Sequence, residues 1–172
     1  MKKNIIIVLI TIGILVGIWF ITSASKPETN ASNAITSNTP QKITFNGEKG
    51  TTLILADNQV KVDAATLDDN QAKFYNVQMP NGKIIYFFVV KDENGVYRSA
   101  ANACEVCFKT YKGFRQEGDE IICNNCGTRY PLEKIGTEKG GCNPGPISPN
   151  LSVKENQVII NQADLEQVLN LF

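Results

Sequence analysis

The order of apolar and polar residues along the chain separates an uncharged first segment from a longer part patterned for strands. From Ile5 to Ile21 the chain carries no charged residue, and Thr11 is the one polar side chain. At about 1.5 Å per residue, such a run reaches the short end of what crosses a bilayer. We therefore expect residues 1–22 to form a transmembrane anchor, with a cleaved secretory signal as the alternative.

The residues around this apolar run predict its orientation and a tether. Lys2 and Lys3 precede it, which favours a cytoplasmic N-terminus and an exported remainder, and so a single-pass protein of the cell membrane. Residues 23–42 are rich in Ser, Thr, Asn and Pro and bury too little surface to offset the entropy of ordering. We expect a flexible linker there and one extracytoplasmic domain over residues 43–172.

Strand patterns dominate the first half of this domain. Two β-prone runs, residues 72–79 and 83–90, flank Pro-Asn-Gly, which is a typical hairpin turn. The run from Ile84 to Val90 is apolar on both faces, which predicts a central strand. Further strands are predicted over residues 51–56, 59–63, 96–100 and 157–160.

The C-terminal residues are spaced for a helix. Four apolar residues lie at i, i+3, i+4 and i+7, which predicts one buried face of a helix over residues 161–172. Asn161 and Asp164 resemble a capping pair at its start. The four residues are Leu165, Val168, Leu169 and Phe172.

The chain also contains an internal similarity. Residues 57–69 and 155–167 align without gaps, share Asn-Gln-Val, and both have the pattern of a strand, a cap and the start of a helix. We hypothesise two similar strand-to-helix units on either side of the cysteine region, with both strands in one sheet. The expected fold class is α+β: a small β-rich domain, preceded by one N-terminal transmembrane helix.

Charge and composition narrow the function. The 17 basic and 17 acidic residues give no net charge, and therefore no reason to expect a nucleic acid as partner. The chain has no histidine, which excludes His-ligated zinc hydrolases and Ser-His-Asp enzymes. Any bound metal must be held by cysteine, carboxylate or carbonyl groups.

Cysteines supply the candidate chemistry. Cys104 and Cys107 form one C-x2-C pair, and Cys123 and Cys126 form a second. A two-residue spacer lets both thiolates face one ion while backbone N–H groups face the sulfurs, and two such knuckles complete a tetrathiolate site. A hairpin turning at residues 117–120 would bring the knuckles together, so we predict a zinc-ribbon-like metal site with these four ligands.

Two alternatives stay open for these residues. Exported cysteines commonly form disulfides, although five is an odd number, and a C-x2-C pair can act as a redox dithiol in a thiol–disulfide oxidoreductase. Cys142 follows Gly140 and Gly141, which would let backbone N–H groups approach its sulfur. We consider it a cofactor-binding residue of the same centre, with a separate reactive thiol or an inert buried cysteine as alternatives.

The cysteine region resembles a known family. The stretches "YFFVVKDENGVYRSAANACEVC" and "YKGFRQEGDEIICNNCGTRYPLEKIGTEKGGCNP" are similar to the FtrD-like family of small membrane-associated iron–sulfur proteins, over roughly Val60 to Leu169. Phe108 departs from the pattern, because a glycine is common after such a knuckle. The resemblance implies an iron–sulfur centre on the four knuckle cysteines, with Cys142 in the signature. It also implies extracytoplasmic electron transfer or iron uptake with a redox or iron-transport partner in the membrane.

The residues and the resemblance point to different metals. Spacing by itself favours one tetrahedral ion, a single iron or zinc, over a multi-iron cluster, and Lys2-Lys3 replaces the Arg-Arg of the export route that folded cluster proteins commonly use. The resemblance implies iron–sulfur. We expect an electron carrier or metal-binding protein rather than a stand-alone enzyme, with a structural zinc-binding interaction domain or a thiol–disulfide oxidoreductase as alternatives.

Overall fold

The computed structural model describes residues 44–172, which belong to one compact unit that spans residues 41–172. The predicted anchor, residues 1–22, and the predicted linker, residues 23–42, lie outside the described residues. Within the described part, no helix is long and apolar enough to cross a membrane.

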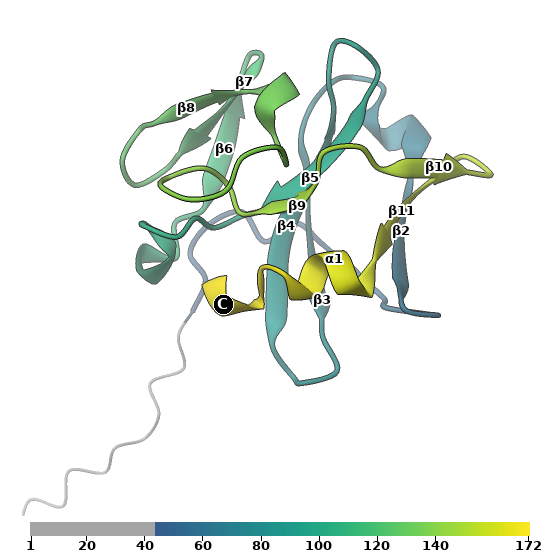
Figure 1. Ribbon diagram of the computed structural model, residues 1–172, viewed down its shortest axis with the longest axis horizontal. Helices are drawn as coiled ribbons and strands as arrows, with labels where there is room; N and C mark the ends of the chain where they lie inside the picture. Colours follow the sequence, from purple (N-terminus) through teal and green to yellow (C-terminus); the bar gives the residue numbers. More distant parts are fainter. Residues whose placement is uncertain (1–43) are drawn as a thin grey trace, which may run out of the picture. The chain divides into compact units, whose positions relative to one another are not determined.

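A five-stranded sheet forms the centre of the domain, with strand order β1-β3-β4-β5-β9 (Figure 1). As expected, the apolar strand β4 is central, and the hairpin at Pro-Asn-Gly joins β3 to β4 antiparallel, with Gly82 at φ +84°. β1 is parallel to β3, whereas β5 and β9 continue the sheet antiparallel. The strands are β1 (Thr51–Leu53), β3 (Lys73–Gln78), β4 (Ile84–Lys91), β5 (Tyr97–Ala101) and β9 (Pro146–Ser148).

The central sheet is buried on both faces, and β4 shows this by alternation. Ile85, Phe87 and Val89 belong to one apolar cluster, whereas Phe88 and Val90 belong to another. Because successive side chains of a strand point to opposite faces, the sheet separates two cores. The first core contains the second sheet and the C-terminal helices, and the second contains three of the cysteines.

The second sheet confirms the internal repeat. Its order is β10-β11-β2, with β10 (Ser152–Lys154), β11 (Gln157–Asn161) and β2 (Gln59–Asp63). The two repeated strands β2 and β11 pair antiparallel, so that Val158 lies opposite Val62. Each is followed by a short helix, a 3-10 helix over Ala64–Leu67 after β2 and α1 (Gln162–Glu166) after β11.

The backbone of the two repeats is alike in detail. Both strands are preceded by a two-residue turn with positive φ at each position, at residues 57–58 and 155–156. The units also exchange equivalent hydrogen bonds: the N–H of Ala64 donates to the carbonyl of Asn156 at 2.9 Å, and the N–H of Gln162 to that of Asn58 at 2.8 Å. An approximate twofold relation between the repeats follows from this exchange.

The C-terminal helix differs from the expectation of one helix over residues 161–172. α1 ends at Glu166, and a 3-10 helix follows over Leu169–Leu171. Of the four predicted residues, Leu165 and Val168 are buried and Leu169 and Phe172 pack partly buried against the same core. The three-residue turns after α1 also bury Leu171, which lies off the predicted face. Asn161 is the N-cap, but its side chain donates to the Asp164 carboxylate at 3.1 Å rather than accepting a backbone N–H.

A third, antiparallel sheet carries the cysteine region against the second core. It has the order β6-β7-β8, with β6 (Phe114–Glu117), β7 (Glu120–Cys123) and β8 (Arg129–Pro131). It lies on the opposite side of the central sheet from β2 and β11 (Figure 1). A β-rich domain with few helices is therefore confirmed, and the described residues contain α-helix only at α1.

Candidate metal centre

The first knuckle follows the central sheet directly. Cys104 and Cys107 lie between β5 and a 3-10 helix over Phe108–Thr110, and both are buried. The N–H of Cys107 donates to the Cys104 sulfur at 3.2 Å, as a metal-binding knuckle requires. Because the helix begins at Phe108, the left-handed residue is delayed to Tyr111, at φ +55°. This is how the chain accommodates Phe108 where a glycine is common.

The second knuckle is the turn between β7 and β8. Cys123 ends β7, and the N–H groups of Asn125 and Cys126 point to its sulfur. Gly127 takes φ +75° and donates to the carbonyl of Cys123 at 2.9 Å, which closes the turn. The backbone N–H groups of both knuckles thus face the sulfurs, as the C-x2-C motifs predicted.

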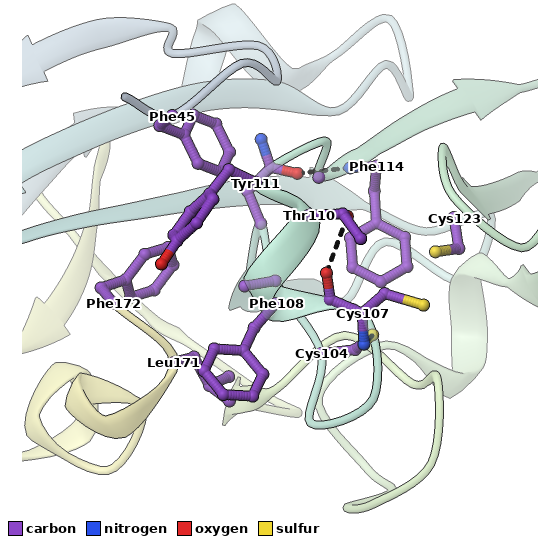
Figure 2. Close-up of a pocket in the computed structure, with 13 residues that line it drawn as sticks. Phe45, Cys104, Cys107, Phe108, Thr110, Tyr111, Phe114, Cys123, Leu171 and Phe172 are labelled. Atoms are coloured by element: carbon purple, nitrogen blue, oxygen red, sulfur yellow. Dashed lines mark hydrogen bonds between the residues drawn. The ribbon is translucent and has the colours of Figure 1, made fainter. Parts of the chain in front are cut away.

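The predicted hairpin between the knuckles is also present. β6 and β7 pair antiparallel with Glu117 opposite Glu120, and Phe114 lies opposite Cys123 at the other end. Figure 2 shows the Phe114 ring beside the sulfurs of Cys107 and Cys123. The hairpin thereby brings the start of β6, which follows the first knuckle, next to the second knuckle.

Asn102 is a structural residue of the site that the sequence analysis did not identify. Its side chain is fully buried, accepts the N–H of Phe114 at 2.6 Å and donates to the carbonyl of Glu48 at 2.8 Å. It joins the strand that leads into the first knuckle to the hairpin that ends in the second. A single asparagine two residues before Cys104 has no sequence signal that distinguishes it from a turn residue.

The five sulfurs form two groups of three that share one member. The sulfurs of Cys104, Cys107 and Cys142 all lie within 4.8 Å of one another, and so do those of Cys107, Cys123 and Cys126. All five side chains carry free thiols. The structure therefore brings together the four knuckle cysteines and places Cys142 with the first knuckle.

Exposure differs across the cluster. Cys104, Cys107 and Cys123 are buried, Cys142 is half-buried, and Cys126 is exposed. On the buried side, these three thiols line a small pocket together with aromatic side chains that include Phe108 and Phe114 (Figure 2). A ligand or partner therefore reaches the cluster from the side of Cys126 and Cys142.

Burial and hydrogen bonding give the thiols of the cluster different pKa values. Burial raises the pKa of Cys104, and it raises that of Cys123 to about 12. The Thr128 hydroxyl, 3.2 Å from the Cys126 sulfur, together with the Thr128 backbone N–H, lowers the pKa of Cys126 to about 6. The neighbouring Cys126 thiol and then burial raise the pKa of Cys142 to about 12. At neutral pH the metal-free cluster thus carries a thiolate at its exposed edge.

The Cys142 loop turns as its glycines predict. Gly140 and Gly141 have φ of +98° and +61°, and the N–H of Asn143 donates to the carbonyl of Gly140 at 3.3 Å. We expected backbone N–H groups beside the Cys142 sulfur. The pKa of this thiol is instead influenced most by the neighbouring Cys126 thiol and by burial. The two glycines therefore allow the tight turn that places the Cys142 thiol in the cluster.

Side chains around the second knuckle support it without adding free positive charge. The Asn125 side chain donates to the Cys107 sulfur at 3.3 Å, which links the two knuckles. Arg115 donates to Asn124 at 2.9 Å, but it also pairs with Glu117 at 2.7 Å. Arg129 pairs with Glu117 and Glu120. Sequence position could have indicated Asn125, since it lies inside the C-x2-C motif.

The donor set fits a thiophilic metal. Five sulfur donors converge with no histidine in the chain, and soft thiolates select zinc, copper(I) or iron–sulfur centres. Coordination would also displace the protons that burial holds on Cys104 and Cys123. The residues that could hold the metal are therefore the four knuckle cysteines and Cys142.

Comparison with known families gives one match over this region. A family described as "Membrane iron-sulfur containing protein FtrD-like" matches residues 67–172, more than half of the chain and all five cysteines. No curated protein and no solved structure gives a match.

Proposed function

Because the chain belongs to the FtrD-like family of membrane iron–sulfur containing proteins, we propose that its domain binds iron through cysteine thiolates and carries electrons or handles iron outside the cell membrane. The proposed ligands are Cys104, Cys107, Cys123 and Cys126, with Cys142 at the same centre. Residues 1–22 would hold the protein in the membrane, with residues 23–42 as tether and the domain extracytoplasmic.

The convergence of five thiols from three separate segments carries this proposal. Both knuckles aim backbone N–H groups at their first sulfur, as sulfur-ligated metal sites do. A set of buried thiols with no charged partner gains little for stability by itself, whereas a metal satisfies all of them at once. The family description supports iron with sulfide as the metal group.

The two sides of the site suit an electron carrier. Cys104, Cys107 and Cys123 pack among the apolar residues of the second core, and the exposed Cys126 gives the centre an edge that a partner can approach. Hydrogen bonds to sulfur and the degree of solvent exposure both tune the potential of such centres. A redox or iron-transport protein of the same membrane is the proposed partner.

Spectroscopy with metal analysis tests the proposal. The full chain would be purified anaerobically in detergent, supplied with ferrous iron and sulfide, and assayed for iron, acid-labile sulfide, visible absorption and reversible reduction. We expect a coloured, redox-active protein, and loss of the colour in Cys123→Ser. A colourless protein with one bound zinc and no redox activity would indicate a structural zinc domain instead.

One observation favours a second candidate, a thiol–disulfide oxidoreductase. The Cys126 thiol is exposed, its pKa is lowered to about 6, and it lies beside Cys142. A Cys126 thiolate could attack a substrate disulfide and release one thiolate, and Cys142 could then displace the second thiolate and form a Cys126–Cys142 disulfide. Repeated reduction of a model disulfide peptide by the metal-free protein, in the presence of dithiothreitol, would support this function.

A further inference from the structure

We propose that the five thiols form a centre with two metal positions, each with three thiolates, and that Cys107 bridges the two ions. One position uses Cys104, Cys107 and Cys142, and the other uses Cys107, Cys123 and Cys126. This inference rests on the proposed function and goes beyond it in the number of ions, the bridging residue and the role of Cys142.

The grouping of the sulfurs carries the proposal. Three thiolates on a tetrahedral ion with bonds of about 2.3 Å lie about 3.8 Å apart. Each group of three has its sulfurs within 4.8 Å of one another, so small rotations of the side chains suffice to close it on an ion. Two such groups with one common sulfur describe two neighbouring ions joined by a shared thiolate.

Cys107 is suited to the shared position. It is only 7% exposed, and it lies between the Cys142 loop and the second knuckle, with a sulfur within 4.8 Å of each. The Asn125 side chain donates a hydrogen bond to this sulfur at 3.3 Å. A thiolate that binds two ions has little lone-pair density left for other partners, and one hydrogen bond satisfies it.

Charge balance also favours two ions over one. Four thiolates around one divalent ion leave two excess negative charges, whereas five thiolates around two divalent ions leave one. Three of the five sulfurs are buried, where uncompensated charge is expensive. The arginines beside the second knuckle pair with Glu117 and Glu120, so they offer the sulfurs little compensation.

Three protein ligands per ion leave one coordination position free on each. An open position is what distinguishes metal sites that exchange ligands from closed structural sites. Cys126 and Cys142, one from each group, lie on the accessible side of the cluster. Sulfide, water or a thiol of a partner could therefore complete either ion from that side, which suits a protein that passes on iron or electrons.

A cobalt titration tests the number of positions. The full chain in detergent, reduced, metal-free and anaerobic, would be titrated with Co²⁺ alone while thiolate-to-cobalt charge-transfer absorption is recorded. We expect a break at two equivalents for the natural sequence and at one equivalent for Cys142→Ser. Cys126→Ser, the corresponding variant in the other group, should also bind one equivalent of Co²⁺. Cys107→Ser should weaken Co²⁺ binding at both positions at least tenfold.

Cadmium NMR adds a readout of the bridge. With ¹¹³Cd²⁺ as the only metal, two cadmium resonances should appear, both coupled to the β-protons of Cys107. Dispersed amide resonances in Cys142→Ser would show that the variant folds. Saturation of the natural sequence at one equivalent, or unchanged uptake of two by Cys142→Ser, would overturn the two-position centre. A protein that gives no charge-transfer band at all would overturn the proposed metal-binding function as well.

Discussion

At the scale of single residues, the surroundings of the five cysteines make their thiols differ. Cys104 and Cys123 lie in the second core, where burial raises the pKa of each. Cys126 lies at the surface with the Thr128 hydroxyl and N–H beside it, and its pKa falls to about 6. Each pKa unit corresponds to about 1.4 kcal/mol between the two protonation states, so position in the fold decides which thiol reacts first.

Thr128 should control the reactivity of Cys126 in the metal-free protein. Thr128→Val removes the hydroxyl at 3.2 Å from the sulfur, so the pKa of Cys126 should rise toward the ordinary thiol range. We expect alkylation of Cys126 by iodoacetamide at pH 6.5 to slow several-fold, because less thiolate is present. Peptide mass spectrometry measures the rate, and Thr137→Val serves as the matched control. Equal rates in all three proteins would contradict this role of the hydroxyl.

A second residue-scale feature is the buried ion pair between Asp92 and Arg98. The Asp92 side chain is 1% exposed, and Arg98 donates to it at 2.7 Å. Burial by itself would raise the pKa of Asp92, but Arg98 and the N–H groups of Val96 and Asn94 outweigh burial and lower it. A lowered folded-state pKa stabilises the fold above the ordinary carboxyl range near pH 4, and that stabilisation disappears as the pH falls through the lowered pKa.

Asp92→Asn should therefore destabilise the domain in a pH-dependent way. At pH 7 we expect a loss of about 3–5 kcal/mol in the free energy of unfolding, because Arg98 is left without its carboxylate. At pH 2.5, below the ordinary carboxyl range, the difference from the natural sequence should shrink, because unfolded Asp92 is then protonated and the stabilisation is lost as the pH falls toward the lowered folded-state pKa. Urea unfolding at the two pH values measures this, with the exposed Asp119→Asn as control. A difference that is independent of pH would contradict the assignment.

At the scale of elements, turns with positive φ define where strands begin. Gly50 precedes β1 at φ +62°, and a Cβ there would lie 1.8 Å from the Phe74 carbonyl oxygen of β3. Gly82, in the β3–β4 hairpin, has φ +84° and nothing within 4 Å of its Cβ position. The two glycines share the left-handed conformation and differ in the space around them.

Alanine substitutions at these two glycines should distinguish the cost of backbone strain from the cost of a steric clash. Gly82→Ala should cost about 1 kcal/mol in the free energy of unfolding, because only the backbone conformation opposes it. Gly50→Ala should cost clearly more, at least about 3 kcal/mol, since β1 must move away from the backbone of β3. Chemical denaturation of the two variants tests this, and similar losses would contradict the close approach of β1 and β3.

At the scale of the whole molecule, the central sheet separates the cysteine cluster from the repeated units. The β2–β11 sheet and α1 pack in the first core, and the cysteines belong to the second. No cysteine belongs to the first core, whereas the second core includes thiols that a metal would join. The two sides of the domain should therefore depend differently on the metal.

Removing the metal should loosen one side of the domain more than the other. A metal bound as proposed would favour the folded state, so its loss would lower the free energy of unfolding, most strongly where its ligands hold the chain. We expect a chelator to increase amide hydrogen exchange in β6, β7, β8 and residues 132–145, with smaller changes in β2 and β11. Uniform changes across the domain, or none, would contradict this division.

Much of the fold and the site could be predicted because the signals are local. The alternation and length of the apolar run predicted β4, Pro-Asn-Gly predicted its hairpin, and the two C-x2-C motifs predicted thiols that converge. The C-terminal helix was predicted too long, because the apolar spacing permits both helix types and packing of Leu171 selected the 3-10 turn. Asn102 had no signal, because its partners are distant in sequence.

The amino-acid sequence alone identified sulfur as the available donor, showed that histidine is missing, and contained an uncharged apolar run over residues 5–21. It also determined the turns, because glycine and asparagine at positive φ act within a few residues. The folded arrangement was needed to establish that Cys142 joins Cys104 and Cys107, that Cys126 faces solvent, and that the two repeated strands pair directly. These outcomes depend on contacts between residues far apart in the chain, where packing of the two cores selects one arrangement among those that local preference allows.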